Sequence, residues 1–200
     1  MITHPTILEG DLVKLIPFEP LHYSALEAVA VKKEIWEFYS VDGSGQGAFA
    51  SIFEAAFAER ERGSQYPFAI FHKESGKMIG STRFTEIQVQ HKRLEIGWTW
   101  LDPAYWATAV NLECKLLLLT HCFEVLGLYR VQLRTDVLNI RSRKAIEKIG
   151  ATFEGVFRHD MVRGNGSRRD SVYYSIIDTE WPAVKDDLTR LLEAKQKSLS

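Results

Sequence analysis

Hydrophobic and polar residues follow two different periods along this chain. In some stretches apolar side chains alternate with polar ones, or form short apolar runs between turn residues, and both patterns are typical of β-strands. Ser75-Gly76 is one such turn, and Gly164-Asn165-Gly166 is another. Seven strands are predicted in this way, over residues 12–18, 66–72, 78–87, 93–101, 129–136, 153–162 and 172–178.

Other segments carry apolar residues every three or four positions, which indicates helices with one buried side. Residues 109–126 are apolar on nearly every side, so we expect that helix to be buried. Gly150 ends the helix predicted over residues 140–149. Trp181-Pro182 begins the last helix, because proline is favoured in a first helical turn. The predicted helices are residues 20–38, 48–62, 109–126, 140–149 and about 182–197.

The order of these elements predicts an α/β (α+β) fold with a mixed sheet. Three consecutive strands precede the buried helix, and a single strand–helix–strand crossover lies at the centre of the chain. Two hundred residues correspond to one domain. We therefore expect a single domain over residues 1–200, with a core of about 7–181 and a C-terminal helix of about 182–197.

Composition excludes several classes of protein. The 25 basic and 26 acidic side chains nearly cancel, which argues against a dedicated nucleic-acid binder. No apolar run approaches the ~20 residues of a membrane span, and the N-terminus has no signal-peptide pattern. Cys114 and Cys122 are expected to be small buried side chains, and no Cys/His cluster indicates a metal. The expectation is a cytoplasmic protein without metal, membrane or nucleic-acid partners.

The central crossover is the segment most suggestive of ligand binding. The strand at residues 94–101 leads through a loop into the buried helix, and the N–H groups at a helix N-terminus attract phosphates. Small residues in the loop, such as Ala107 and Ala109, allow a ligand to approach the backbone closely. An ordinary connection between strand and helix remains the alternative.

Four short motifs follow one another in this half of the chain. They are WLDPxYW at residues 100–106, FExxG at 123–127, NxxS at 139–142 and GxxxEG at 150–155. In this order they resemble the GNAT superfamily of N-acetyltransferases, and more narrowly its RimJ/RimL-like branch. The resemblance covers roughly Ile7 to Trp181.

The resemblance implies a mostly antiparallel sheet of about seven strands with a central acyl-CoA-binding unit. The strands at residues 93–101 and 129–136 would splay apart to admit the pantetheine arm of acetyl-CoA, and the pyrophosphate would lie on the loop before the buried helix. The cofactor-binding residues implied in this way are Trp100, Leu101, Trp106, Ala107, Thr108, Ala109, Val110, Asn111 and Asn139.

The chain departs from the superfamily at this loop. The usual pattern is Gln/Arg-x-x-Gly-x-Gly/Ala, and the matching residues here are Trp106, Ala109 and Asn111. Alanine disfavours a positive φ, so the loop is where acetyl-CoA affinity is most open to question. Asn111 offers a side chain as a substitute, whereas Glu113 and Lys115 are expected on a solvated helix face.

The same resemblance implies roles in acetyl transfer. Ser142 matches a residue that donates to the departing thiolate, and Asn139 matches one that binds the pantetheine, although Asn139 also suits a helix N-cap. Glu95 aligns with a carboxylate used as base or water relay. A backbone N–H near Gly97 would polarise the thioester carbonyl, and a glycine within a strand is itself typical of a bulge.

Strand alternation gives Glu95 the same face as Gly97 and Thr99, opposite Ile96, Trp98 and Trp100. The branch's proposed acidic base aligns with Met161, and its neighbour Asp160 is expected on a solvated strand face. Aromatic residues of the first two helices would roof the acceptor site, with most of them in the core. They are Trp36, Phe38, Tyr39, Phe49, Phe53 and Phe57.

The expected activity is acetyl-CoA-dependent transfer of an acetyl group to a primary amine by direct attack. The acceptor is either a protein N-terminus or a small-molecule amine, and a homodimer is possible. The competing hypothesis is a non-catalytic acyl-CoA-binding or ligand-sensing domain with the same fold, since the loop is altered and no base stands out.

Overall fold

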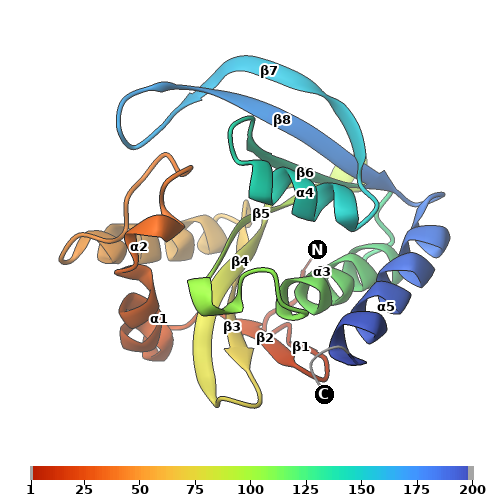
Figure 1. Cartoon of the computed structure of the whole chain (residues 1–200), viewed down its shortest axis with the longest axis horizontal. Helices are drawn as coiled ribbons and strands as arrows, with labels where there is room; N and C mark the ends of the chain where they lie inside the picture. Colours follow the sequence, from red (N-terminus) through yellow and green to blue (C-terminus); the bar gives the residue numbers. More distant parts are fainter. Residues whose placement is uncertain (1, 198–200) are drawn as a thin grey trace.

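One open sheet of eight strands runs through the computed structural model, which describes residues 2–197 (Figure 1). The strand order is β1-β2-β3-β4-β5-β6-β8-β7, and every neighbouring pair is antiparallel except β5 with β6. The predicted mixed, mostly antiparallel sheet is therefore confirmed. The strands are β1 (Leu8–Glu9), β2 (Val13–Pro17), β3 (Tyr66–His72), β4 (Lys77–Gln88), β5 (Arg93–Leu101), β6 (Arg130–Asp136), β7 (Thr152–Val162) and β8 (Arg168–Ile177).

The count of about seven strands missed β1. That strand has only two residues, so it contains no complete hydrophobic period from which it could be recognised. It pairs with β2 through Leu8 opposite Leu15 and Glu9 opposite Lys14.

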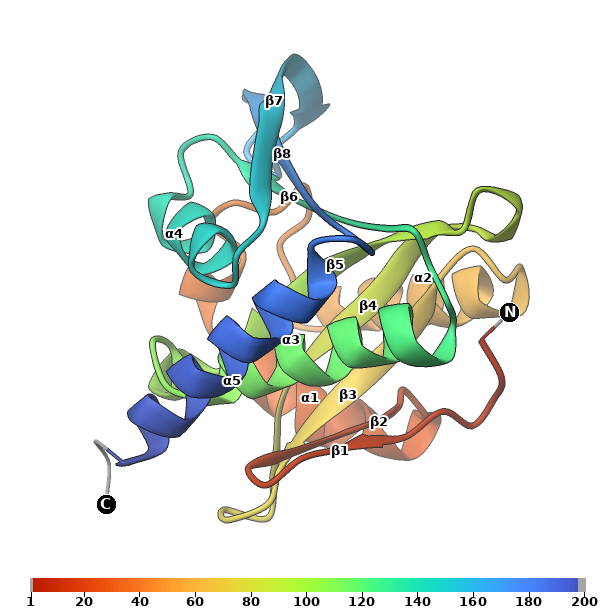
Figure 2. The same ribbon diagram turned by 90° about the vertical axis from the view of Figure 1, so that its right-hand side faces the viewer.

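Helices cover both faces of the sheet. In Figures 1 and 2, α1 and α2 lie on one side of the central strands, α3 and α5 lie on the other, and α4 lies beside β6. Two hydrophobic clusters follow from this arrangement, one containing Phe18, Phe49 and Trp100 and the other containing Phe84 and Leu118. The helices are α1 (Tyr23–Ala30), α2 (Ala48–Glu61), α3 (Val110–Thr120), α4 (Ile140–Lys148) and α5 (Trp181–Lys197).

Two of the predicted helices are shorter than expected. The helix predicted over residues 20–38 is α-helical only from Tyr23 to Ala30. At its end the Trp36 indole N–H donates to the Ala30 carbonyl at 2.7 Å. That bond occupies a carbonyl that a longer helix would need. The helix predicted to reach residue 126 ends at Thr120 and continues as a π-helical turn over His121–Val125.

Glu113 is buried rather than solvated, which corrects the expectation for this helix face. Its side chain comes from α3, and the residue is 3% exposed. The carboxylate accepts from the backbone N–H groups of Asp11, Leu12 and Val13 at 2.9, 2.8 and 2.7 Å. A Cβ on Gly10 would lie 2.5 Å from the carboxyl carbon, so glycine leaves the room that this contact needs. Glu113 thus fixes the β1–β2 turn onto α3.

We predict that Glu113→Gln lowers the free energy of unfolding by about 2 kcal/mol, because an amide replaces a buried carboxylate that accepts from three backbone N–H donors. The measurement is urea unfolding followed by circular dichroism. Glu193→Gln, on the exposed side of α5, is the control and should change stability by less than about 0.5 kcal/mol. Equal losses in the two variants would contradict a structural role for Glu113.

Candidate active site

The two central strands part in the middle of the sheet. β5 and β6 pair in parallel only at Arg93 with Arg130, Leu94 with Val131 and Glu95 with Gln132. Past that point β5 pairs only with β4 and β6 only with β8, so the expected splay is present. A cavity of about 240 Å³ opens in the gap. Its walls come from the second half of β5, the end of β6, the start of α4, and the segment of residues 35–40.

A β-bulge changes the direction of the side chains on β5. Arg83 pairs with Gly97 and Ser81 with Trp100, so two residues of β5 oppose one residue of β4. Trp98 has a φ of 50°, in the left-handed region. The bulge confirms the expectation raised by the glycine at position 97.

The bulge also makes the expected alternation wrong. Trp98 lies against the Arg83 guanidinium, 4.6 Å from its ring centroid, and so shares the face of Glu95 and Gly97. Trp100 packs on that same face with Trp36 and Phe49, whose ring centroids each lie 5.8 Å away. Thr99 turns instead toward α3. One extra residue has exchanged the two faces of the strand from this point.

The loop before α3 adopts a conformation that the alanine at position 109 fits. Ala109 has a φ of −70°, and the left-handed residue is Ala107, with a φ of 58°. The departure from the superfamily pattern at Ala109 therefore creates no backbone strain. Thr108 Oγ1 accepts from the Val110 N–H at 3.3 Å, while within residues 2–197 the N–H groups of Asn111 and Leu112 have no backbone acceptor. These two N–H groups are donors available to a ligand.

Lys115 points into the cavity instead of lying on a solvated face. The residue is 6% exposed, and its Nζ donates to Thr99 Oγ1 at 2.8 Å, which in turn bonds Thr82 Oγ1 at 2.7 Å. Burial lowers the pKa of Lys115 to about 8. Asn111 lies one turn earlier on α3, and its Oδ1 is buried without a hydrogen-bond partner. This wall of the cavity is therefore polar and weakly cationic.

Glu95 lies at the point where β5 and β6 separate. It is 2% exposed, and its carboxylate accepts from Gln132 Nε2 at 2.8 Å and from Arg134 Nε at 3.1 Å. Burial raises the pKa of Glu95, and the nearby Arg134 guanidinium opposes that shift. A buried carboxyl group whose pKa is raised is a candidate to exchange a proton with a bound ligand.

Asp160 is not on a solvated strand face. Its side chain is mostly buried, accepts from the Tyr173 hydroxyl at 3.3 Å and lies 3.9 Å from Arg134 Nη1. Met161, its neighbour, contributes to the cavity wall. Arg134 thus lies between two carboxylates, Glu95 and Asp160.

Asn139 and Ser142 lie together at the start of α4. Asn139 Oδ1 accepts from the Ser142 N–H at 3.0 Å, so the expected N-cap is confirmed. Both residues line the cavity. Among the residues that the structure describes, none forms a hydrogen bond with Ser142 Oγ, which leaves that hydroxyl free to donate to a ligand. The neighbouring Arg141 lies 3.5 Å from the centroid of the Trp106 ring.

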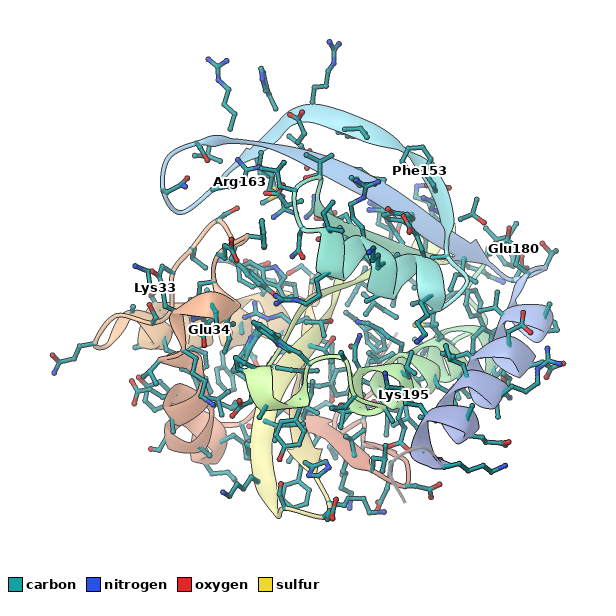
Figure 3. The ribbon with its side chains drawn as sticks, in the orientation of Figure 1. Lys33, Glu34, Phe153, Arg163, Glu180 and Lys195 are labelled. Atoms are coloured by element: carbon teal, nitrogen blue, oxygen red, sulfur yellow. The ribbon has the colours of Figure 1, made fainter. Side chains whose placement is uncertain are left out.

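The segment between α1 and α2 forms the roof. Phe38 and Tyr39 line the cavity, and the Tyr39 hydroxyl donates to the Thr99 carbonyl at 2.9 Å. The tip of the β7–β8 hairpin lies over this segment, where the Gly164 N–H donates to the Tyr39 carbonyl at 3.0 Å. Figure 3 shows the same approach, with Arg163 at the end of the hairpin above Lys33 and Glu34. The remaining aromatic residues named for this roof pack in the hydrophobic core: Trp36, Phe49, Phe53 and Phe57.

Unsatisfied polar atoms concentrate in this cavity. Eight buried side-chain polar atoms of the described residues have no hydrogen-bond partner, and the residues that carry four of them line the cavity. Buried polar atoms are normally paired, so this concentration marks a place where a ligand completes the bonding. The four are Ser40 Oγ, Trp100 Nε1, Asn111 Oδ1 and Arg169 Nε.

Sequence reasoning missed Ser40 and Arg169 and assigned Lys115 to the surface. No motif marks Ser40 or Arg169. The alternation of β8, with Arg168 exposed and Arg169 buried, is the only pattern that could have singled out the arginine.

The described residues contain no group of three potential metal ligands among their His, Cys, Asp and Glu side chains. Cys114 and Cys122 are both buried and free, as expected. None of the helices within residues 2–197 is both long enough and apolar enough to cross a membrane.

The parted strand pair within a mostly antiparallel sheet defines a class of protein that can bind a ligand between its two central strands. Residues 13–152 match the family model described as an acetyltransferase (GNAT) domain, which is well over half of the chain. The chain belongs to the GNAT acetyltransferase family.

Relatives agree with this assignment. The uncharacterized N-acetyltransferase YoaA of Bacillus subtilis (strain 168) is 28% identical over 174 residues, which are 86% of this chain and 96% of YoaA. A GCN5-related N-acetyltransferase from Brucella melitensis is 28% identical, with a TM-score of 0.87 over 95% of this chain and 86% of its own. Mycobacterium smegmatis RimJ, solved in complex with CoA-disulfide, shares the fold at 20% identity, with a TM-score of 0.79 over 94% and 95% of the two chains.

Proposed function

We propose that this acetyltransferase uses acetyl-CoA to acetylate a primary amine, either a protein N-terminal amine or the amine of a small molecule, as a RimJ/RimL-like enzyme. The observation that carries the proposal is the cavity between β5 and β6, bounded by free donors at the N-terminus of α3. That combination suits a long ligand with an anionic end and a reactive end inside the sheet.

The residues around the cavity fit acetyl-CoA. The N–H groups of Asn111 and Leu112 would bind the pyrophosphate, since a helix N-terminus stabilises negative charge. The unpaired Trp100 Nε1 and Asn111 Oδ1 offer a donor and an acceptor to the pantetheine amides. The full set that would hold the cosubstrate is Trp100, Leu101, Trp106, Ala107, Thr108, Ala109, Val110, Asn111 and Asn139.

Acetyl-CoA supplies a thioester whose carbonyl carbon is attacked by the amine. A C–N bond forms and the C–S bond breaks, while the amine loses a proton and the departing thiolate gains one. Ser142 Oγ would hold a proton for the sulfur, and its lack of another partner supports this role. Glu95 would accept the proton of the amine, directly or through water. Its burial, which raises the pKa of its carboxyl group, supports that role.

The proposed activity is tested by calorimetric titration with acetyl-CoA, followed by release of free thiol in the presence of a panel of primary amines. We expect binding and amine-dependent thiol release, with the acetylated amine identified by mass spectrometry. Binding without thiol release above background would favour the sensing domain instead. Failure to bind acetyl-CoA would contradict both functions.

Ser142→Ala should lower kcat by about a hundredfold, because the thiolate loses its proton donor, and should leave the Kd for acetyl-CoA unchanged within about twofold. Steady-state thiol release and calorimetry measure the two quantities. Ser51→Ala, on the exposed surface of α2, is the matched control and should behave as the unaltered protein. Unchanged turnover of Ser142→Ala would remove the hydroxyl from the mechanism.

Glu95→Gln should change the dependence of kcat on pH. A base must be deprotonated to act, so kcat of the unaltered protein should fall as the pH drops through the raised pKa of Glu95. In Glu95→Gln this fall of kcat at low pH should disappear, and kcat should be low at every pH, while acetyl-CoA binding persists. The measurement is kcat at saturating substrates from about pH 5 to pH 8. An identical pH profile in the variant would show that Glu95 is not the base.

A further inference from the structure

Arg169 is a buried cation whose bonding is incomplete. The residue is 9% exposed, reaches the cavity from β8, and donates from Nη1 to the Phe38 carbonyl at 3.2 Å, while its Nε has no partner. No carboxylate of the described residues lies within ion-pair distance of it. The two that influence it electrostatically are Asp136 and Asp160.

Both of those carboxylates are already engaged. Asp136 accepts from Arg163 through both of its oxygens, at 2.5 and 2.9 Å. Asp160 is held by the Tyr173 hydroxyl and lies beside Arg134. The positive charge of Arg169 is therefore only partly compensated by the chain itself.

Two further polar side chains lie near the segment that Arg169 contacts, one on the cavity wall and one behind it. Ser40 lines the cavity, two residues beyond the carbonyl that Arg169 contacts, and its buried Oγ also has no partner. Arg83 is 3% exposed, stacks on Trp98 and donates to Gln65 Oε1 at 3.2 Å, with no acidic partner among residues 2–197. Arg83, Arg169 and Arg141 all act electrostatically on the Tyr39 hydroxyl.

The charges on the cavity wall are unequal. Glu95 is the one acidic side chain among the described lining residues, and it is paired with Arg134. The basic lining residues are Lys115, Arg134, Arg141 and Arg169. Arg169 comes from β8 and Ser40 from the Phe38–Ser40 roof, whereas the free N–H donors proposed for the pyrophosphate lie at the N-terminus of α3. Arg169 and Ser40 therefore have no role in the proposed binding of acetyl-CoA and are left for the second substrate.

We propose that the acceptor is a small amine that also carries an oxyanion, either a carboxylate or a phosphate, and that Arg169 and Ser40 bind this oxyanion. Arg83, behind Trp98, adds positive potential. The inference rests on the proposed acetyl transfer and narrows its acceptor. The cavity has a volume of about 240 Å³, and the β7–β8 tip is hydrogen-bonded to its roof at Tyr39, so a small ligand fits this position better than a polypeptide.

Matched pairs of amines test the proposal. Alanine is compared with alaninamide, and phosphoethanolamine with ethanolamine, so that each pair differs in its anionic group. We expect kcat/KM to be about 10- to 100-fold higher for the anionic member of at least one pair, as an arginine–oxyanion contact provides. The pair that shows the preference distinguishes a carboxylate from a phosphate.

Arg169→Gln should remove that preference, lowering kcat/KM for the anionic amine by about 10-fold or more and for the neutral amine by less than about twofold. Ser40→Ala, which breaks no bond within the described chain, should reduce the preference in the same direction. Arg168→Gln removes the same charge from the neighbouring exposed position of β8 and should leave the preference intact.

The results separate this proposal from the proposed function. Neutral and anionic amines acetylated equally well would overturn the oxyanion site and leave acetyl transfer standing. If no amine is acetylated, the oxyanion site is tested by calorimetric titration with alanine and with phosphoethanolamine. Binding that is lost in Arg169→Gln supports the oxyanion site without acetyl transfer, and absence of binding overturns it.

Discussion

The separation of β5 from β6 is the constraint on which the rest of the structure depends. Beyond Glu95 and Gln132 the two strands no longer pair through their backbones, yet both continue, because β4 supports one and β8 supports the other. A gap through a buried sheet exposes backbone groups that need partners. The bulge at Trp98 redirects side chains along one edge of the gap, α3 presents free N–H groups at its mouth, and the start of α4 presents Ser142.

Features set by local chemistry could be predicted from the sequence. The strands of the β3–β4–β5 meander, the N-cap at Asn139, the bulge beside Gly97 and the burial of both cysteines each depend on neighbouring residues or on a period within one element. The splay of β5 and β6 was inferred differently. It came from the resemblance to a known family, since no pattern within either strand indicates where their pairing stops.

Features set by distant contacts were missed. Glu113 and Lys115 resemble solvated residues of a helix, but the first meets N–H donors about a hundred positions earlier and the second donates directly to Thr99 on β5. Trp98 and Thr99 were predicted on the wrong faces of β5, because the one residue inserted at the bulge reverses the strict alternation. Arg169 lies in no motif, and its role depends on the contact between β8 and the segment that contains Phe38, which the alternation of β8 alone does not indicate.

The near-neutral charge of the whole chain conceals an uneven local distribution. The net charge of −1 excludes a broadly basic surface, whereas the cavity wall carries four basic side chains and one acidic one. Burying a cation without a counter-charge costs free energy, and leaving buried polar atoms without hydrogen-bond partners adds to that cost. Arg169 carries both costs, and four of the eight unpaired buried atoms of the described residues belong to residues that line this one cavity. Such a concentration is explained most simply if anionic ligands complete the bonding there, which makes the interior of the sheet, and not the protein surface, the place where charge recognition occurs.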